Sequence, residues 1–394
     1  MNSSDKRQQI LKAAVAIMAR KGKDATIAEI ATAAQVTDSI IYHYFKNKED
    51  LLFHSAGEHL RGGIALLREQ LQGIQDPVSR LRKLIWFQLY YHDKNPHYTN
   101  FTIFECRSKK NFFSHKAFNY FRQWTRILKE IIEDGGKAGV FSADLNITVV
   151  RDAIFGLLDM ENIQCMTGHH DGEAHTDLDD IMDLILPMIT RTTPQSTLSN
   201  DKSRRIIAAA ETVFARQGYD RARILEISRS AGVAEGTVYE YFKNKEELLY
   251  SVLHCRFQEH LASLDELFDI KTPVRKLRRF IRYHFSLYLN QPSFVKTFIL
   301  NGIYNRRFYA SLPYRDFRRY LDTLDAIMDG GKSSGSFNPR INNRIFKNLF
   351  IGAFSHMALR WLYVDHGTQI DKTREINAAI DLLNRAAVRQ EPVV

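Results

Sequence analysis

The stretch "YHYFKNKEDLL" occupies residues 42–52, and "YEYFKNKEELL" occupies residues 239–249. Nine of these eleven positions are identical, and the two copies lie 197 residues apart in a chain of 394 residues. The similarity extends upstream, where residues 10–36 align with residues 205–233. A repeat of about half the chain is too long for a solenoid, whose period is roughly 20–50 residues. We therefore predict that the chain contains two copies of one whole subunit.

Each copy has the sequence pattern of a helical protein. Apolar residues at Ile27, Ile30, Ala31 and Ala34 follow the i, i+3, i+4, i+7 spacing of an amphipathic helix, and the second copy repeats this pattern. Only nine prolines are present, and no stretch alternates with a period of two for long enough to indicate a sheet. The predicted fold class is all-α, with two tandem units.

The repeat divides the chain into five segments. Between the two copies the sequence is polar, rich in Ser and Thr, and contains a proline, as is typical of a linker. We predict a first helix-turn-helix domain at 1–52, a first helical effector and dimerisation domain at 53–190, a linker at 191–203, a second helix-turn-helix domain at 204–249 and a second effector and dimerisation domain at 250–394.

Composition narrows the class of protein. The chain is 44% hydrophobic and 25% charged, which is typical of a globular protein. Its formal net charge of +10 permits either nucleic acid or an anionic lipid as a partner and does not choose between them. No apolar run reaches the roughly 18 residues that a membrane span requires, and the N-terminus lacks a secretory signal. Three widely spaced cysteines suit a reducing compartment. We expect a cytoplasmic protein that does not enter the membrane.

The opening stretch follows a predicted helix-turn-helix unit. A short helix at 27–34 and a second at 38–44, with Thr37 as its cap, are joined by a turn of the length that such units use. Asn47 and Asn244 are predicted to cap a third helix, which places Lys48 and Lys245 in its first turn. A cation is unfavourable there unless the site binds an external anion such as a phosphate; the alternative is a pair of solvated lysines.

At this point the two copies resemble the tetracycline-repressor (TetR) family of bacterial regulators. The resemblance is carried by "AGVAEGTVYEYFKNKEELL" at 231–249 and, more loosely, by "AAQVTDSIIYHYFKNKEDLL" at 33–52. It is strong over 7–52 and 204–249, and extends to the rest only in length and helical character. It implies a three-helix DNA-binding domain and a larger helical domain that dimerises and binds an effector. With both subunits in one chain, we predict a covalent pseudo-dimer on a double-stranded DNA operator.

The resemblance also implies roles for individual residues. The residues implicated in base contacts are Thr37, Asp38, Ser39, Ile40 and His43 in the first copy and Glu235, Gly236, Thr237 and Glu240 in the second. Those implicated in backbone contacts are Thr26, Tyr44, Lys48, Arg223, Tyr241 and Lys245. The hydroxyls of Tyr42 and Tyr239 are further candidates for phosphate contacts. Because the two reading surfaces differ, we predict an operator that is not palindromic.

The effector domains are rich in aromatic residues, which form either ordinary core or a cavity for a hydrophobic effector. Helices at 147–166, 177–190, 341–363 and 371–388 are predicted to pack as a four-helix bundle between the halves, partly by family resemblance. The second copy is similar to fatty-acid-metabolism repressors of the family, which implies an acyl-CoA or fatty-acid-like effector. The candidate effector-binding residues are Trp86, Tyr90, Phe104, Arg107, Phe121, Trp124, Tyr283, Phe298 and Arg306.

Other functional classes have weaker support. A cluster of histidines and carboxylates at 169–175 lacks the spacing of a metal site, and no arrangement of residues indicates catalysis, so we predict no metal, no cofactor and no enzyme. The main alternative is a helical lipid- or acyl-binding protein with degenerate DNA-binding modules. The pattern leaves open whether the whole chain dimerises further.

Overall fold

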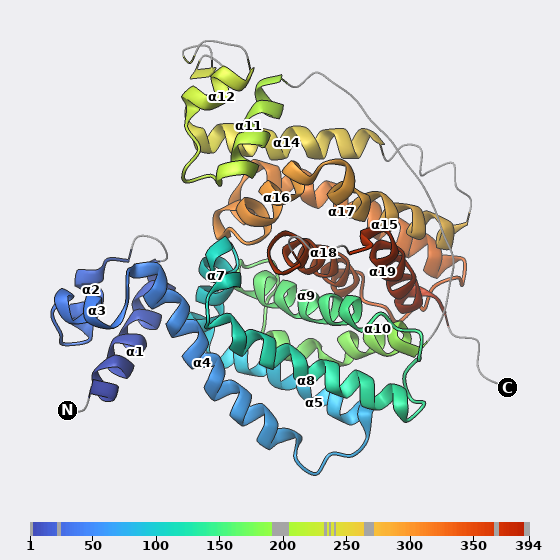
Figure 1. Ribbon diagram of the computed structural model, residues 1–394. Helices are drawn as coiled ribbons and strands as arrows, with labels where there is room; N and C mark the ends of the chain where they lie inside the picture. Colours follow the sequence, from blue (N-terminus) through green and yellow to red (C-terminus); the bar gives the residue numbers. More distant parts are fainter. Residues whose placement is uncertain are drawn as a thin grey trace.

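The computed structural model describes most of the chain as helix (Figure 1). Within the described residues, the one β-type contact is a bridge between Phe337 and Val388, so the predicted all-α class is confirmed. None of the described helices is long and apolar enough to cross a membrane. The structure describes residues 3–21, 25–190, 205–231, 235, 238–239, 242–263, 272–365 and 370–389. The predicted linker at 191–203 lies outside them.

The first unit begins with one long and two short helices and continues into a bundle of further helices. Pro77 starts one of the longer helices, with Asp76 accepting the Ser79 N–H as its cap. Its helices are α1 (Ser3–Lys21), α2 (Ile27–Ala33), α3 (Asp38–Tyr44), α4 (Lys48–Leu71), α5 (Pro77–Lys94), α6 (Pro96–Asn100), α7 (Lys110–Ser114), α8 (Phe118–Lys137), α9 (Ile147–Met166) and α10 (Leu178–Thr190), with a π-helical segment at Phe101–Cys106 after α6.

The second unit repeats this order. Pro273 begins an 18-residue helix, as Pro77 does in the first unit, and a π-helical segment again follows the next short helix. Its helices are α11 (Arg205–Gln217), α12 (Ile224–Ala231), α14 (Lys245–Ser263), α15 (Pro273–Asn290), α16 (Pro292–Phe298), α17 (Leu312–Ser333), α18 (Asn343–Leu359) and α19 (Lys372–Ala387).

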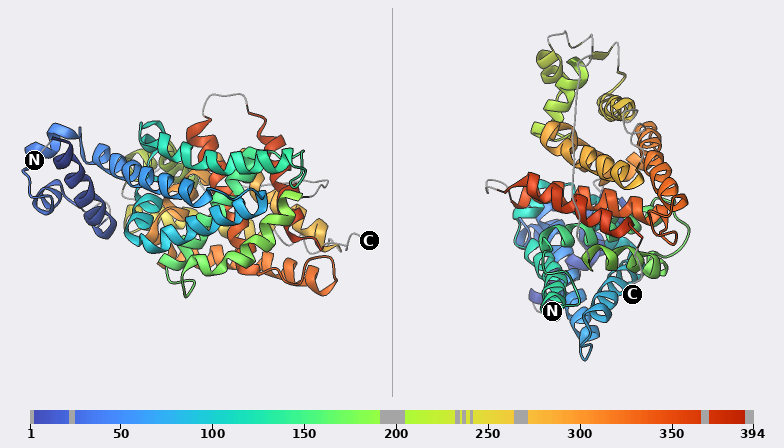
Figure 2. Two further views of the ribbon diagram at one scale, coloured as in Figure 1. Left: turned by 90° about the horizontal axis from the view of Figure 1, so that it is seen from below. Right: turned by 90° about the vertical axis from the view of Figure 1, so that its right-hand side faces the viewer.

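The two units pack against each other through the last two helices of each. Helix α9 lies against α18 and α10 against α19, next to one another in both figures (Figures 1 and 2). Gly156 of α9 and Gly352 of α18 occupy equivalent positions of the repeat and meet at the crossing. A Cβ built on Gly156 would lie 2.0 Å from the Gly352 carbonyl oxygen. Because glycine has no side chain, the two helix backbones can touch here.

The two predicted helix-turn-helix domains differ in how they join the rest of the molecule. The first shares one continuous apolar core with the larger helical domains of both units, whereas the second has a separate cluster of its own. They occupy different corners of the molecule, the first at the left and the second at the top of Figure 1. The predicted boundaries at 52 and 249 fall inside α4 and α14, so one long helix connects the two domains of each unit.

Candidate nucleic-acid interface and effector cavity

A complete capping box begins helix α2. The Thr26 hydroxyl accepts the Glu29 N–H at 3.2 Å, and the Glu29 carboxylate accepts the Thr26 N–H at 2.9 Å. A hydrogen bond from Lys21, then the Thr26 N–H, lower the pKa of Glu29 to about 2. Thr26 is exposed but its hydroxyl serves the cap, and its predicted contact with the DNA backbone stays a prediction.

The turn and the recognition helix follow in the predicted places. Gln35 sits in the turn with a φ of 50°, in the left-handed region that favours glycine. Thr37 occupies the cap position of α3 but makes no side-chain capping bond. Along α3, Ile41 is buried, which fixes the inner face of the helix. The predicted base-contacting residues therefore point outward: Thr37, Asp38, Ser39 and His43 are exposed, and Ile40 is half-buried.

Two tyrosines at equivalent positions stand out on the protein surface. Tyr42 is 55% exposed and Tyr239 is 51% exposed, whereas the next tyrosine of the first copy, Tyr44, is half-buried. Exposure of a large ring at the same place in both copies fits contact with an external partner better than a folding role. Both side chains can present a hydroxyl to a phosphate.

The caps of α4 and α14 are alike in the two copies. Asn47 accepts the Asp50 N–H and Asn244 accepts the Glu247 N–H, each at 2.8 Å, so both asparagines cap as predicted. The reciprocal bond is displaced by one residue. Asp50 accepts the N–H of Lys46, and Glu247 accepts the corresponding N–H, rather than that of the asparagine itself. Each acidic side chain thus accepts a hydrogen bond from the backbone N–H one residue before the cap.

The two lysines of the capped turns lie in different surroundings. Lys48 is half-buried at the start of α4. Lys245 donates to the carbonyl oxygens of Tyr219, Asp220 and Ala222 at 2.7, 3.2 and 3.1 Å, and its ammonium lies 4.5 Å from the Tyr219 ring centre. These three bonds use all three of its N–H donors, so contact with a phosphate requires that some be exchanged.

The structure describes only part of the predicted DNA-contacting surface of the second copy. Arg223 precedes α12 and is exposed, as is Glu235. Val238 is fully buried and belongs to the core of this domain. The predicted contact residues Gly236, Thr237, Glu240 and Tyr241 lie outside the described residues.

A cavity of about 140 Å³ opens in the first effector domain next to the contact with the second. Its apolar wall includes Phe113, Phe118 and Phe121, and arginines are distributed around it. Because both halves contribute to the lining, the cavity spans the interface between them. The lining residues that bear charge are Arg107, Arg122, Arg151, Asp152 and Arg360.

Three of the nine predicted effector residues line this cavity: Arg107, Phe121 and Trp124. The Trp124 indole donates to Gln88, which also lines the cavity. The other predicted residues lie elsewhere. Trp86 and Tyr90 stack on each other at the outer face of α5. Phe104 contacts Tyr309, and Phe298 is buried among phenylalanines. Tyr283 lines a separate pocket on α15, and Arg306 donates to Asn100 and Met166.

Sequence reasoning missed the charged residues that join the halves. Arg360 Nε lies 2.6 Å from Asp152, and His356 Nε2 lies 2.8 Å from Asp159, which also pairs with Arg107 at 2.9 Å. Burial alone would raise the pKa of Asp159, but Arg107 and His356 outweigh it, so the pKa lies below its ordinary value. Carboxylates within the apolar run 147–166 were the available signal, because a buried charge requires a partner.

A third ion pair crosses the same interface. Arg344 donates to Glu161 at 2.6 Å and to Asp177 at 2.7 Å. Burial raises the pKa of Glu161 more than Arg344 lowers it. The acids thus belong to the first half and the bases to the second, so the contact is complementary in charge as well as in shape.

Comparison with known proteins is consistent with this architecture. Residues 10–54 and 206–252 match the model of bacterial regulatory proteins of the tetR family, and residues 58–193 match the C-terminal region of YsiA-like proteins. A fatty acid metabolism regulator protein of Bacillus subtilis is 30% identical over 197 residues, which are 46% of this chain and 93% of the relative.

Two further relatives are similar over part of the chain. The transcriptional repressor NicS of Pseudomonas putida is 31% identical over 151 residues, or 36% of this chain and 68% of the relative. The structure of the regulator FadR from Bacillus subtilis, in complex with stearoyl-CoA, is 24% identical, with a TM-score of 0.43, and covers 45% of this chain and 97% of that chain.

Proposed function

Because this chain belongs to the TetR family, and is thus a ligand-responsive, DNA-binding regulator of transcription, we propose that it acts alone as a pseudo-dimer. The observation that supports this most strongly is the crossing of α9 and α18 at Gly156 and Gly352. Equivalent residues of the two copies meet there, as they would on the twofold axis of a dimer of identical chains. The third-helix caps are likewise repeated in both copies.

The two units bind one operator through recognition helices whose base-contacting residues differ. A pair of helix-turn-helix units binds half-sites about 34–36 Å apart, with each recognition helix in the major groove. Asp38, Ser39 and His43 are exposed in the first copy, and Glu235 is exposed in the second. Each good base contact discriminates by about 1–3 kcal/mol, so unlike helices favour unlike half-sites. We place this activity in the cytoplasm, where the operator is accessible.

The effector is an amphipathic anion, for which a long-chain acyl-CoA is the best candidate. Phe113, Phe118 and Phe121 offer an apolar surface to an acyl chain, and Arg122 and Arg151 offer cations to an anionic head group. The wall supplied by α18 makes the cavity sensitive to how the halves are packed. A ligand that binds better to one packing shifts the population toward it, and the regulator acts as a repressor if that packing no longer fits the operator.

The DNA half of the proposal is tested by selecting genomic fragments that the full chain protects. We expect salt-sensitive, sequence-selective binding to an inverted pair of unlike half-sites by one chain per operator. A perfectly palindromic operator would contradict the claim that the two recognition helices contact different bases. Ligand binding without selective DNA binding would instead favour a helical acyl-group-binding protein with degenerate DNA-binding modules.

The effector half is tested by titrating the operator complex with a long-chain acyl-CoA. We expect release of the DNA, and we expect Arg122→Ala to raise the required concentration by roughly tenfold, because a charge-assisted hydrogen bond contributes about 1.5 kcal/mol. Arg126→Ala is the matched control, since Arg126 is exposed one turn further along α8 and does not line the cavity. Equal responses from the two variants would place the head group elsewhere.

A further inference from the structure

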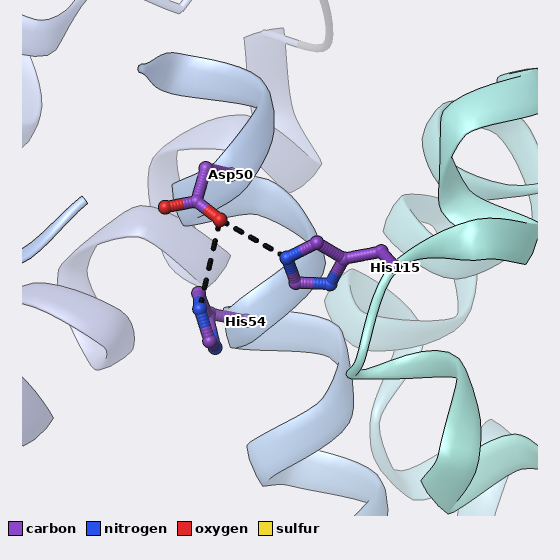
Figure 3. A group of neighbouring side chains, drawn as sticks. All are labelled: Asp50, His54 and His115. Carbon is purple, nitrogen blue, oxygen red and sulfur yellow. Dashed lines mark hydrogen bonds and ion pairs between the residues drawn. The ribbon is translucent and has the colours of Figure 1, made fainter. Parts of the chain in front are cut away.

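Three side chains suited to metal binding converge where the first DNA-binding domain joins its effector domain (Figure 3). Asp50 and His54 lie one turn apart at the start of α4, and His115 comes from the segment between α7 and α8. The Asp50 Oδ1 atom lies 3.0 Å from His115 Nε2 and 3.6 Å from His54 Nε2. One ligand atom of each residue falls within 4.8 Å of the other two.

We propose that Asp50, His54 and His115 bind a divalent transition-metal ion of the zinc class. Zinc lies about 2.0–2.2 Å from nitrogen and oxygen ligands in a tetrahedron, which places neighbouring ligand atoms roughly 3.3 Å apart. The two Asp50–histidine distances of 3.0 and 3.6 Å lie on either side of this value, so only small shifts of the histidines would bring both to it. Imidazole ligands favour zinc and its neighbours over magnesium or calcium, which bind oxygen.

Binding of the metal ion breaks two hydrogen-bonding contacts that the histidines make in this structure. Arg7 lies 3.2 Å from His54 Nδ1, and the Ala117 N–H donates to His115 Nδ1 at 3.2 Å. A metal-bound histidine donates its second ring N–H, so both contacts must give way, and the affinity is reduced by roughly 10–100-fold compared with a site that has acceptors there. Because Asp50 and His54 lie at the start of α4 and His115 precedes α8, the ion fixes the start of α4 relative to the effector domain.

The second copy lacks the same set of ligands. Glu247 and Ser251 occupy the positions equivalent to Asp50 and His54, and the Ser251 hydroxyl donates to the Glu247 carbonyl oxygen. A serine hydroxyl is a poor zinc ligand compared with an imidazole. The proposal therefore predicts one ion per chain, bound by the first copy.

The test is metal titration of the chelator-treated full chain, with Zn²⁺ followed by calorimetry and Co²⁺ by its visible absorption. We expect one equivalent to bind and the Co²⁺ spectrum to be that of a tetrahedral site. His54→Ala and His115→Ala should each weaken Zn²⁺ binding at least tenfold, because each removes one of three protein ligands. Ser251→Ala, at the position equivalent to His54, should leave binding unchanged.

A fold control is needed because His54 packs on the Phe45 ring. Asp50→Asn keeps a carbonyl acceptor for the Lys46 N–H but removes the anionic ligand, so it should fold and lose Zn²⁺-dependent thermal stabilisation. Failure of the unmodified chain to bind Zn²⁺, or binding that is unchanged in all three ligand variants, would overturn the proposal.

Discussion

The equivalent helices α5 and α15 of the two effector domains differ in the packing around one equivalent residue. In α5 of the first half, Gln88 accepts a hydrogen bond from Trp124 and lines the cavity. The equivalent residue of α15 in the second half is His284, which bonds Tyr320 at 3.0 Å and packs on the rings of Phe350 and Phe354. One copy thus has a cavity where the other has a close-packed aromatic core. The two copies share the order of their helices, and their side chains leave a cavity in the first copy but pack closely in the second.

The DNA-binding domains differ in a related way. The first is tied to its effector domain by Asp50 and His115, and by a 2.9 Å bond from Asn111 to Glu49, within one continuous core. The second has its own core, and both Tyr250 and polar contacts such as that of Lys296 with the Ala215 carbonyl connect it to the effector domain. A change at the cavity therefore has the more direct route to the first DNA-binding domain, since packed cores transmit displacement.

The largest effect is expected where the halves cross. Gly156→Ala places a Cβ 2.0 Å from a backbone oxygen, so the two helices must separate, which should destabilise the chain by about 3 kcal/mol or more. Gly62→Ala is the matched control: nothing lies within 4 Å of its Cβ, and alanine is favoured in a helix by about 1 kcal/mol. Chemical denaturation should thus show opposite signs, and stabilisation by both would mean that the halves do not pack this way.

Effects of intermediate size are expected for the two lysines of the capped turns, on stability for Lys245 and on DNA binding for Lys48. Lys245→Ala leaves three carbonyl oxygens without this donor and removes its contact with the Tyr219 ring, which should cost the second domain about 1–2 kcal/mol of stability. Lys48→Ala should instead weaken binding to all DNA sequences alike and reduce the slope of log affinity against log salt by about 1. Filter binding across a salt series and thermal unfolding distinguish the two results. Unchanged DNA binding by Lys48→Ala would refute its phosphate contact.

The smallest effect concerns the turn of the first helix-turn-helix. Gln35→Gly relieves the cost of a left-handed backbone and should stabilise the chain by about 0.5 kcal/mol, after the greater unfolded-state freedom of glycine is subtracted. Gln72→Gly is the control, because Gln72 ends α4 with an ordinary φ of −62° and gains nothing from glycine. Equal destabilisation of both variants, measured by urea unfolding, would show that Gln35 is not strained.

The sequence by itself determined the duplication, the helical fold and the helix-turn-helix of the first copy. The predicted recognition helix at 38–44 matches α3, and Asn47 and Asn244 cap their helices as expected. These features are local: capping bonds and amphipathic stripes join residues three or four positions apart, so their spacing can be read directly from the chain.

Only the tertiary structure decided which aromatic residues form a wall and which form a core. Trp124 and Phe298 are both buried, but Trp124 lines the cavity while Phe298 packs among phenylalanine rings, although the sequence presents both as aromatic residues of a helical domain. The pairing of Asp152 with Arg360 joins residues 208 positions apart. Such partners, like the orientation of Lys245 toward carbonyl oxygens, depend on how whole helices pack, because the free energies of burial and of ion pairing are set by neighbours that are remote in sequence.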